Sequence, residues 1–313
     1  MSGWKILVTD GLAEKGLAIL SNAAQVDEQQ GISIEELIGI IGEYDALIVR
    51  GQTQVTADVL SAAQKLRVVG RAGVGVDNID LAAANIHNIT VVNSPHATTQ
   101  AVAEHTLALI FALARSLPSA DATMKSGLWL KKNFLGVEIK DQVLGIIGLG
   151  HIGSLVAHMA KSLHMSVLGY DPLISPADIQ TREADPVTLQ DLFAQSDFIS
   201  IHVPLNPETR GMIDGQSFGY MKHGMRLICT ARGGVVDETA MLGALESGQV
   251  AGAALDVFTN EPPGLSALVS HPRVIATPHI AAQTEEAQAR AAVDIATEVL
   301  AALRGDPLRW KIV

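Results

Sequence analysis

The sequence has 313 residues, enough for about two domains, and 48% of them are hydrophobic, as in globular proteins. The 33 acidic residues outnumber the 22 basic ones and give a net charge of −11, which argues against a nucleic-acid partner and against an anionic membrane. One cysteine, Cys229, excludes an intramolecular disulfide and a metal site of several cysteines, and we expect no metal. The N-terminus has no apolar signal core, and the longest apolar run, Thr106 to Ala114, is too short to span a bilayer, so we expect a cytoplasmic protein.

Short β-rich runs alternate with helical stretches through the first hundred residues, which is typical of a parallel α/β sheet. The expected strands are Lys5–Thr9, Ala46–Val49, Val68–Arg71 and Thr90–Val92. The expected helices are Leu12–Ser21, Ile34–Ile41 and Ala57–Ala63. Together these elements predict one small sheet domain.

A long apolar helix, predicted over Val102 to Leu117, is followed by a second alternating set. Its six expected strands are Val143–Ile147, Ser166–Tyr170, Phe198–His202, Arg226–Thr230, Ala251–Asp256 and Val274–Ala276. Six strands with helices between them predict a doubly wound parallel sheet. The proline-containing stretches Pro172–Pro176 and Glu261–Gly264 are expected to form loops.

An Ala-rich amphipathic helix, predicted over Glu285 to Arg304, comes after the second set and is expected to pack back on the first domain. The sequence therefore predicts an α/β protein with two Rossmann-like domains, each a doubly wound parallel sheet, and a cleft between them. Residues 1–98 and 285–313 would form a discontinuous substrate-binding domain, and residues 99–284 an inserted nucleotide-binding domain.

A glycine-rich turn lies between the strand Val143–Ile147 and the next helical stretch. Gly148, Gly150 and Gly153 form the pattern GxGxxG, and Asp171 ends the following strand 23 residues after the first glycine. This context is that of a dinucleotide fingerprint, in which the glycines allow a tight turn, close approach of a pyrophosphate and close helix packing. Asp171 would accept hydrogen bonds from the ribose hydroxyls and repel a 2′-phosphate, so NAD is favoured over NADP as the cofactor.

Three later segments place reactive side chains directly after predicted strands. Arg232 lies in CTARGGVVDE, Glu261 in ALDVFTNEPP and His279 in TPHIAAQT. Ligands of open α/β sheets sit at the carboxyl ends of the strands, so these three side chains are expected to converge. Each also has a structural explanation: Arg232 could form a loop salt bridge beside two glycines, Glu261 could be a turn residue before two prolines, and His279 could be a solvated histidine.

These segments closely resemble the D-isomer-specific 2-hydroxyacid dehydrogenases, and the resemblance covers nearly the whole chain. The matching stretches are residues 71–80, 148–153, 231–234, 256–263 and 278–279. The resemblance implies that Arg232 holds the substrate carboxylate, that His279 is the general acid/base and that Glu261 pairs with it. This agrees with the chemistry, since oxidising a secondary alcohol needs a base for the hydroxyl proton while the hydride leaves to nicotinamide.

The resemblance also implies cofactor contacts, so residues 99–284 would be an NAD-binding domain. The implied contacts are His151 and Ile152 to the pyrophosphate, Val203 and Pro204 to the adenosine side, Thr230 and Ala231 to the nicotinamide, and Asp256 to the carboxamide end. For Asp256 there is a structural alternative, in which it caps the turn after its strand. His151 departs from the family, where many relatives have an arginine.

Within the family the chain is most similar to enzymes that act on D-3-phosphoglycerate, whose phosphate requires extra cations. Arg50, together with Arg71 or with Lys131 and Lys132, is a candidate phosphate site; each base also has an alternative as an exposed surface charge. The loop containing Gly73, Val74 and Gly75 offers backbone N–H groups to the substrate carboxylate. The sequence departs from the common family pattern at residues 95–99, at Ala281 and at Gln283, and these differences bear on the substrate selectivity of the chain.

The expected function is NAD-dependent oxidation of D-3-phosphoglycerate to 3-phosphohydroxypyruvate, the first step of serine biosynthesis, in the interdomain cleft with closure excluding water. Two alternatives are a reductase for glyoxylate, hydroxypyruvate or another 2-keto acid, and an NAD-sensing binding module. We expect a homodimer or homotetramer in which the helix Val102–Leu117 is buried at a two-fold interface, unless it is an intramolecular core helix. Because the sequence ends at Val313, just after the catalytic unit, serine feedback through further domains is not expected.

Overall fold

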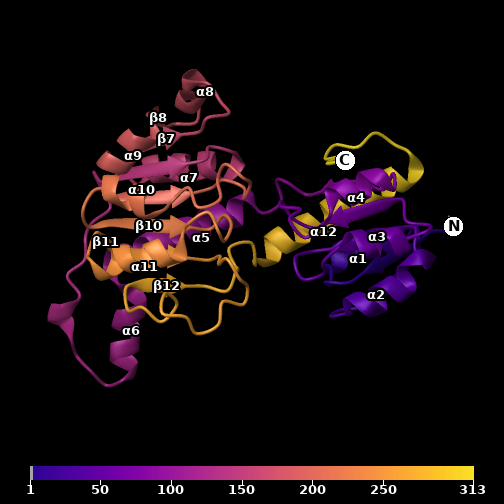
Figure 1. Ribbon diagram of the computed structural model, residues 1–313, viewed down its shortest axis with the longest axis horizontal. Helices are drawn as coiled ribbons and strands as arrows, with labels where there is room; N and C mark the ends of the chain where they lie inside the picture. The colour runs from indigo at the N-terminus through magenta and orange to yellow at the C-terminus, as the bar shows by residue number, and fades with distance from the viewer. Residues whose placement is uncertain (1–2) are drawn as a thin grey trace. The chain divides into compact units, whose positions relative to one another are not determined.

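The computed structural model describes residues 3–313, and their contacts form two compact units (Figure 1). Unit 1 contains the residues up to Thr98 together with Ala282–Val313, and unit 2 contains Thr99–Ala281. The second boundary therefore falls at residue 282, whereas the sequence placed it at residue 285.

Unit 1 is a parallel sheet of five strands in the order β2-β1-β3-β4-β5. The strands are β1 (Lys5–Val8), β2 (Gln25–Glu28), β3 (Ala46–Val49), β4 (Val68–Arg71) and β5 (Thr90–Asn93). The helices are α1 (Glu14–Ser21), α2 (Ile34–Ile40), α3 (Ala57–Ala62), α4 (Leu81–Ile86) and α12 (Glu285–Arg304), with a 3-10 turn, η1 (Ile41–Glu43). This order reverses between β1 and β3, which makes their carboxyl ends a topological switch point.

Alternation along the strands divides the core of unit 1 into two layers. Leu7 and Leu47 pack on one face with residues of α2 and α3, and Ile6 packs on the other face with α12. Glycine allows α12 to approach closely, since a Cβ on Gly70 of β4 would lie 2.5 Å from Val299 Cγ2. The C-terminal helix thus belongs to the core of the N-terminal unit, as the sequence predicted.

The bounds of α12 follow from its capping residues. Thr284 accepts a hydrogen bond from Ala287 N at the start of the helix, and Gly305 ends it in the left-handed region with φ +80°. Both are the expected signals for the ends of a helix. Its observed bounds agree with the prediction.

Unit 2 is a parallel sheet of seven strands in the order β12-β11-β10-β9-β6-β7-β8. The strands are β6 (Val143–Ile147), β7 (Ser166–Tyr170), β8 (Asp185–Pro186), β9 (Phe198–Ile201), β10 (Met225–Cys229), β11 (Val250–Leu255) and β12 (Val274–Ala276). The helices are α5 (Thr99–Arg115), α6 (Leu117–Lys125), α7 (His151–Ser162), α8 (Pro176–Thr181), α9 (Leu189–Gln195), α10 (Gly215–Tyr220) and α11 (Glu238–Glu246), with a 3-10 turn, η2 (Lys131–Asn133). Among residues 3–313, no helix has the length and apolar character needed to cross a bilayer.

The order of unit 2 reverses between β6 and β9, and helices cover both faces of the sheet, so the predicted α/β class with doubly wound parallel sheets is confirmed. Leu227 and Leu255 pack with Met241 of α11 on one face. Ile228 packs on the opposite face with Ile110 of α5. This arrangement brings the carboxyl ends of β6, β9, β10, β11 and β12 to one edge of the sheet.

Several predicted elements differ from the structure. The strand β2 was missed, and so was the two-residue strand β8. The long apolar helix begins at Thr99 and ends at Arg115, because Ser116 adopts the left-handed region with φ +50° and α6 follows as a separate helix. Residue Pro176, predicted in a loop, is the first residue of α8.

Candidate active site

The glycine fingerprint connects β6 to α7 at the switch point of unit 2. Gly148 has φ +89°, and a Cβ on Gly153 would lie 2.0 Å from Gly148 O, so the turn and the close packing both require glycine. A Cβ on Gly150 would meet no atom within 4 Å, so open space lies in front of the residue that precedes α7. Among residues 3–313, no side chain caps the start of this helix. The site therefore fits a pyrophosphate, with His151 and Ile152 in the first turn.

Asp171 lies beside the fingerprint. Its Oδ2 accepts a hydrogen bond from Leu149 N at 2.9 Å, and its Oδ1 accepts one from Leu173 N at 3.0 Å. Each carboxylate oxygen has two lone pairs, so the group can still accept bonds from ribose hydroxyls. Val203 and Pro204 follow β9, the neighbouring strand of the switch point, and the side chain of Val203 comes close to Gly148.

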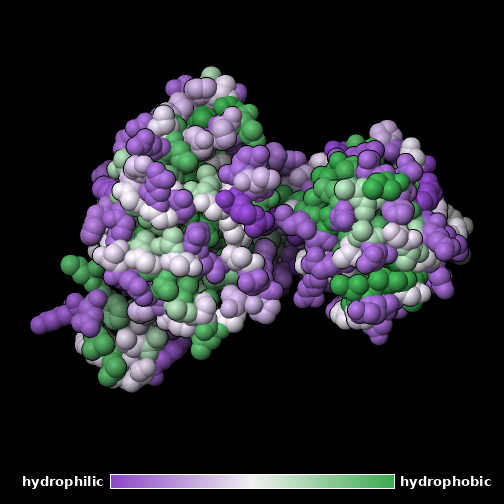
Figure 2. All heavy atoms as spheres, viewed as in Figure 1, coloured by the Kyte–Doolittle hydropathy of each residue, from purple (hydrophilic) through white to green (hydrophobic). Residues whose placement is uncertain are grey.

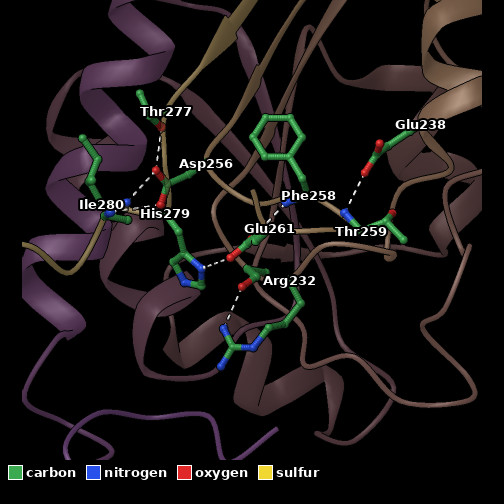
Figure 3. Close-up of polar contacts among 11 residues, drawn as sticks. Arg232, Glu238, Asp256, Phe258, Thr259, Glu261, Thr277, His279 and Ile280 are labelled. Carbon is green, nitrogen blue, oxygen red and sulfur yellow. Dashed lines mark hydrogen bonds and ion pairs between the residues drawn. The ribbon is translucent and has the colours of Figure 1, made fainter. Parts of the chain in front are cut away.

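His279 and Glu261 form a pair at the carboxyl edge of the sheet (Figure 3). His279 Nδ1 lies 2.8 Å from Glu261 Oε2, and Glu261 Oε1 accepts a hydrogen bond from Phe258 N at 3.1 Å. Burial raises the pKa of Glu261, but the hydrogen bonds from His279 and Phe258 outweigh it, and the pKa lies below its ordinary value. With Nδ1 directed at a carboxylate, Nε2 of the imidazole is the nitrogen left for a substrate proton.

Arg232 follows β10 on the same edge. Its Nη1 donates to Ala231 O at 2.7 Å (Figure 3). The next residue is packed tightly, since a Cβ on Gly233 would lie 1.8 Å from Phe258 O. Thr230 is buried, with its hydroxyl 3.0 Å from that of Thr106 on α5. The structure thus brings Arg232, Glu261 and His279 to one edge of unit 2.

Asp256, which follows β11, is completely buried and holds the loop that carries His279. Its Oδ1 accepts from Thr277 Oγ1 at 2.5 Å and from Ile280 N at 2.9 Å, and its Oδ2 accepts from Ala281 N at 2.9 Å (Figure 3). Burial raises the pKa of Asp256, but hydrogen bonds from His105, Thr277 and the two backbone N–H groups lower it below its ordinary value. These bonds show the structural role of Asp256, and its contact with the cofactor carboxamide stays a prediction.

Sequence reasoning assigned no role to His105, which faces Asp256 from α5. Its Nε2 lies 3.6 Å from Asp256 Oδ1 and 3.4 Å from Thr277 Oγ1. The available signal was weak: a histidine beside the apolar run that begins at Thr106. Among residues 3–313, the structure contains no group of three or more His, Cys, Asp and Glu side chains that would suit a metal ion.

Unit 1 brings several of the predicted substrate residues together at its own switch point. Arg50, after β3, donates from its backbone N to Asp10 Oδ2 at 2.7 Å, and Asp10 follows β1. The Arg71 Nε donates to Arg50 O at 3.1 Å, and its guanidinium lies against Gly73, where a Cβ would meet Nη1 at 1.5 Å. The Arg50 Nη2 also donates to Gln283 Oε1 at 2.9 Å. Burial lowers the pKa of Arg50, and the charge of Asp10 opposes this shift.

The loop after β4 is held from β5. The Asn93 Nδ2 donates to Val74 O at 2.7 Å, and Ser94 N donates to Gly73 O at 3.0 Å, which fixes the backbone that leads to Gly75. Lys131 and Lys132 belong to the other unit, where they form an exposed 3-10 turn after α6. Unit 1 therefore gathers Arg50, Arg71 and the glycine loop, but not the two lysines.

Residues 107–281 match the model of the D-isomer specific 2-hydroxyacid dehydrogenase, NAD binding domain. The match covers more than half of the chain and includes the fingerprint, Arg232, Glu261 and His279. The chain belongs to this family, and unit 2 carries its NAD binding domain.

Individual proteins of similar sequence or structure give a more specific comparison than the family model. The chain is 46% identical over 305 residues to D-3-phosphoglycerate dehydrogenase of Synechocystis sp., covering 97% of this chain and 55% of that protein. The chain spans about half the length of the curated relatives it matches. Among solved structures, the TT0316 protein from Thermus thermophilus has a TM-score of 0.91 at 32% identity, with 99% of this chain and 100% of that chain covered. A glyoxylate reductase from Paecilomyes thermophila has a TM-score of 0.90 at 28% identity, with 100% and 99% covered.

Proposed function

We propose that the chain is an NAD-dependent dehydrogenase that oxidises D-3-phosphoglycerate to 3-phosphohydroxypyruvate, the first step of serine biosynthesis. The observation that carries the reaction type is the 2.8 Å contact between His279 and Glu261, at the carboxyl edge of the NAD binding domain. The curated relatives named D-3-phosphoglycerate dehydrogenase support the choice of substrate.

Each residue of the edge has a chemical task in this proposal. His279 takes the hydroxyl proton at Nε2 during oxidation, and Glu261 stabilises the imidazolium that results. Arg232 binds the substrate carboxylate with its guanidinium, whose geometry matches a carboxylate. The fingerprint glycines, His151, Ile152 and Asp171 would hold NAD, which would supply the hydride acceptor. Val203 and Pro204 border the adenosine side, and Thr230 and Ala231 the nicotinamide side.

The phosphate would be recognised by Arg50 and Arg71. Arg50 follows β3 and Asp10 follows β1, so Arg50 lies at the switch point of the unit 1 sheet, where ligands of such sheets bind. The nearby Arg71 adds a second guanidinium, and the loop from Gly73 to Gly75 adds backbone N–H groups. Two arginines held together through the Arg50 backbone, in a protein with a net charge of −11, favour a strongly anionic substrate group such as a phosphate. We keep Lys131 and Lys132 as weaker candidates.

The test is NADH consumption with 3-phosphohydroxypyruvate and with hydroxypyruvate, each titrated at one enzyme concentration. We expect a large preference in kcat/KM for the phosphorylated acid. Arg50→Ala should reduce that preference by roughly 10- to 150-fold, the range for losing a hydrogen bond to a charged group. Arg67→Ala is the matched control, because Arg67 is exposed and precedes β4 instead of following a strand. Equal or better use of hydroxypyruvate by the wild type would refute the proposed substrate.

A reductase for glyoxylate, hydroxypyruvate or another unphosphorylated 2-keto acid is the second candidate. It is favoured by the glyoxylate reductase structure, which this chain covers almost completely. An NAD-sensing binding module is the third, and slow turnover with every 2-keto acid would support it. The same titration distinguishes the three, since only the first requires the phosphate.

We also propose a homodimer or homotetramer. Eight residues of α5 are buried within unit 2, while Phe111 of the same helix is 39% exposed, and further exposed apolar residues follow along the chain. Leu117, Met124, Trp129 and Leu135 are between 53% and 97% exposed. Hydrophobic atoms gather at the lower left end of unit 2, where Figure 1 places α6 (Figure 2). Sedimentation velocity of Trp129→Asp should show dissociation toward monomers. The cytoplasmic location stays a prediction.

A further inference from the structure

A second histidine lies behind the loop that carries His279. His105 belongs to α5, and its side chain is 20% exposed, while the Asp256 carboxylate that it faces has no exposed surface. Its Nε2 lies 3.6 Å from Asp256 Oδ1 and 3.4 Å from Thr277 Oγ1. His105 lies on a different element from both, so it links α5 to the ends of β11 and β12.

The loop that His105 supports is an unusual piece of backbone. His279 has φ +53°, a region in which non-glycine residues are strained and persist only when their surroundings hold them. Three hydrogen bonds to Asp256 hold it: His279 N to the backbone O, Ile280 N to Oδ1 and Ala281 N to Oδ2, each 2.9 Å. The orientation of the Asp256 carboxylate therefore sets the backbone that follows His279.

A fully buried carboxylate remains in one orientation only if its oxygens are satisfied. Three of these partners, Thr277 Oγ1, Ile280 N and Ala281 N, belong to the loop that Asp256 holds, so they move with that loop. His105 is attached to α5, which packs on the sheet through Leu109, Ile110 and Leu113. It thus supplies a support for Asp256 from outside the loop.

We propose that His105 is a positioning residue for the reaction proposed above. Its Nε2–H, directed at Asp256 Oδ1 and Thr277 Oγ1, holds the carboxylate in the orientation that accepts from Ile280 N and Ala281 N. Through that carboxylate it fixes the imidazole of His279 opposite Glu261. His105 does not touch the reacting atoms in this scheme.

Two substitutions separate a hydrogen-bonding role from simple filling of space. His105→Gln keeps an N–H donor near the position of Nε2, whereas His105→Leu keeps apolar volume and loses the donor. His158→Leu is the matched control, because His158 also pairs with a carboxylate, Glu183 at 2.8 Å, but on the exposed surface of α7.

The first readout is amide hydrogen exchange of residues 277–284, which does not depend on turnover. In His105→Leu we expect the Ile280 and Ala281 amides to exchange about fivefold faster or more, since a weakened hydrogen bond raises local opening. The second readout is steady-state kinetics: kcat should fall about tenfold in His105→Leu, with KM for NADH within about twofold. His105→Gln and His158→Leu should match the wild type within about threefold in both.

The outcomes separate this inference from the proposed function. Equal loss in His105→Gln and His105→Leu, or unchanged exchange in a folded His105→Leu, would overturn the positioning role. A wild type that reduces no 2-keto acid would refute the proposed function, and the exchange experiment would still decide the role of His105. If circular dichroism shows that His105→Leu is unfolded, His105→Asn replaces it. Its shorter amide cannot reach the Nε2 position, so exchange as slow as in His105→Gln would also overturn the inference.

Discussion

Replacing Glu261 with glutamine should separate catalysis from stability. Glutamine keeps the shape of the side chain but removes the negative charge 2.8 Å from His279 Nδ1. A hydrogen bond to a charged group contributes about 1.5–3 kcal/mol. If this stabilisation applies to the imidazolium formed during the reaction, kcat should fall roughly 10- to 150-fold. The free energy of unfolding should fall far less, because the two side chains are 45% and 38% exposed and an exposed ion pair contributes about 0.2–1 kcal/mol to stability.

The assay compares kcat and KM for the oxidation of D-3-phosphoglycerate by NAD, the direction in which the imidazolium forms, with the free energy of unfolding from urea titrations. Glu183→Gln is the control, because Glu183 lies at the same 2.8 Å from His158 Nδ1, in a more exposed pair. It should show the same small change in stability and no change in kcat. A folded protein loses the contribution of a carboxylate with a lowered pKa only as the pH falls through that lowered pKa. Glu261 therefore stays ionised above about pH 6, so its own protonation does not affect the comparison of the two proteins between about pH 6 and 8.

Two results would refute this reasoning. A kcat for Glu261→Gln within about twofold of the wild type would mean that the charge does not stabilise the imidazolium. A loss of stability as large as the loss in catalysis would mean that Glu261 acts by holding the loop through Phe258 N.

Three further predictions concern the cofactor site and the core. Gly150→Ala should fold normally, since its Cβ meets only open space, but that Cβ should occupy the space in front of the helix and weaken NADH binding. Gly153→Ala should also lose about 1–3 kcal/mol of stability, because its Cβ would contact Gly148 O. Calorimetry measures the binding and urea unfolding the stability, and equal stability of the two variants would contradict the packing argument. Asp171→Asn should raise kcat/KM with NADPH about tenfold relative to NADH by removing the like charge, and an unchanged ratio would show that Asp171 does not set the preference. Burial lowers the pKa of His202 to about 4, so the stability that its neutral ring contributes is present above about pH 6.5 and falls by up to about 2 kcal/mol at about pH 5. In His202→Gln unfolding should depend less on pH over this range, and an unchanged dependence would assign it to other groups.

The elements predicted well are those whose boundaries carry their own chemical signals. The strand Val143–Ile147 is apolar and ends at a glycine, and its bounds are those of β6. Helix α12 begins after Thr284 and ends before Gly305, and both ends were found. Such signals act over a few residues, so they can be recognised without knowledge of what the element packs against.

The missed strands lack such signals because tertiary contacts alone define them. β2 has the sequence QVDE, lies at the edge of its sheet and pairs only with β1, so neither alternation nor an apolar run marks it. β8 is two residues long and also lies at an edge. The break after Arg115 depends on the left-handed conformation of Ser116, a residue type that is common inside helices too.

In the candidate site, too, some features follow from the residue types in the sequence and others only from contacts in the folded structure. The motifs predicted Arg232, Glu261 and His279 as reactive residues, because their chemistry is carried by the residue types themselves. The motifs left two explanations for Asp256, and only its surroundings show which backbone groups it holds. β11 and β12 are neighbours in register, with Leu255 opposite Ala276, so Asp256 necessarily lies opposite Thr277 and beside the loop that follows. The order of strands in the sheet therefore determines what Asp256 holds, and that order cannot be obtained from the spacing of residues along the chain.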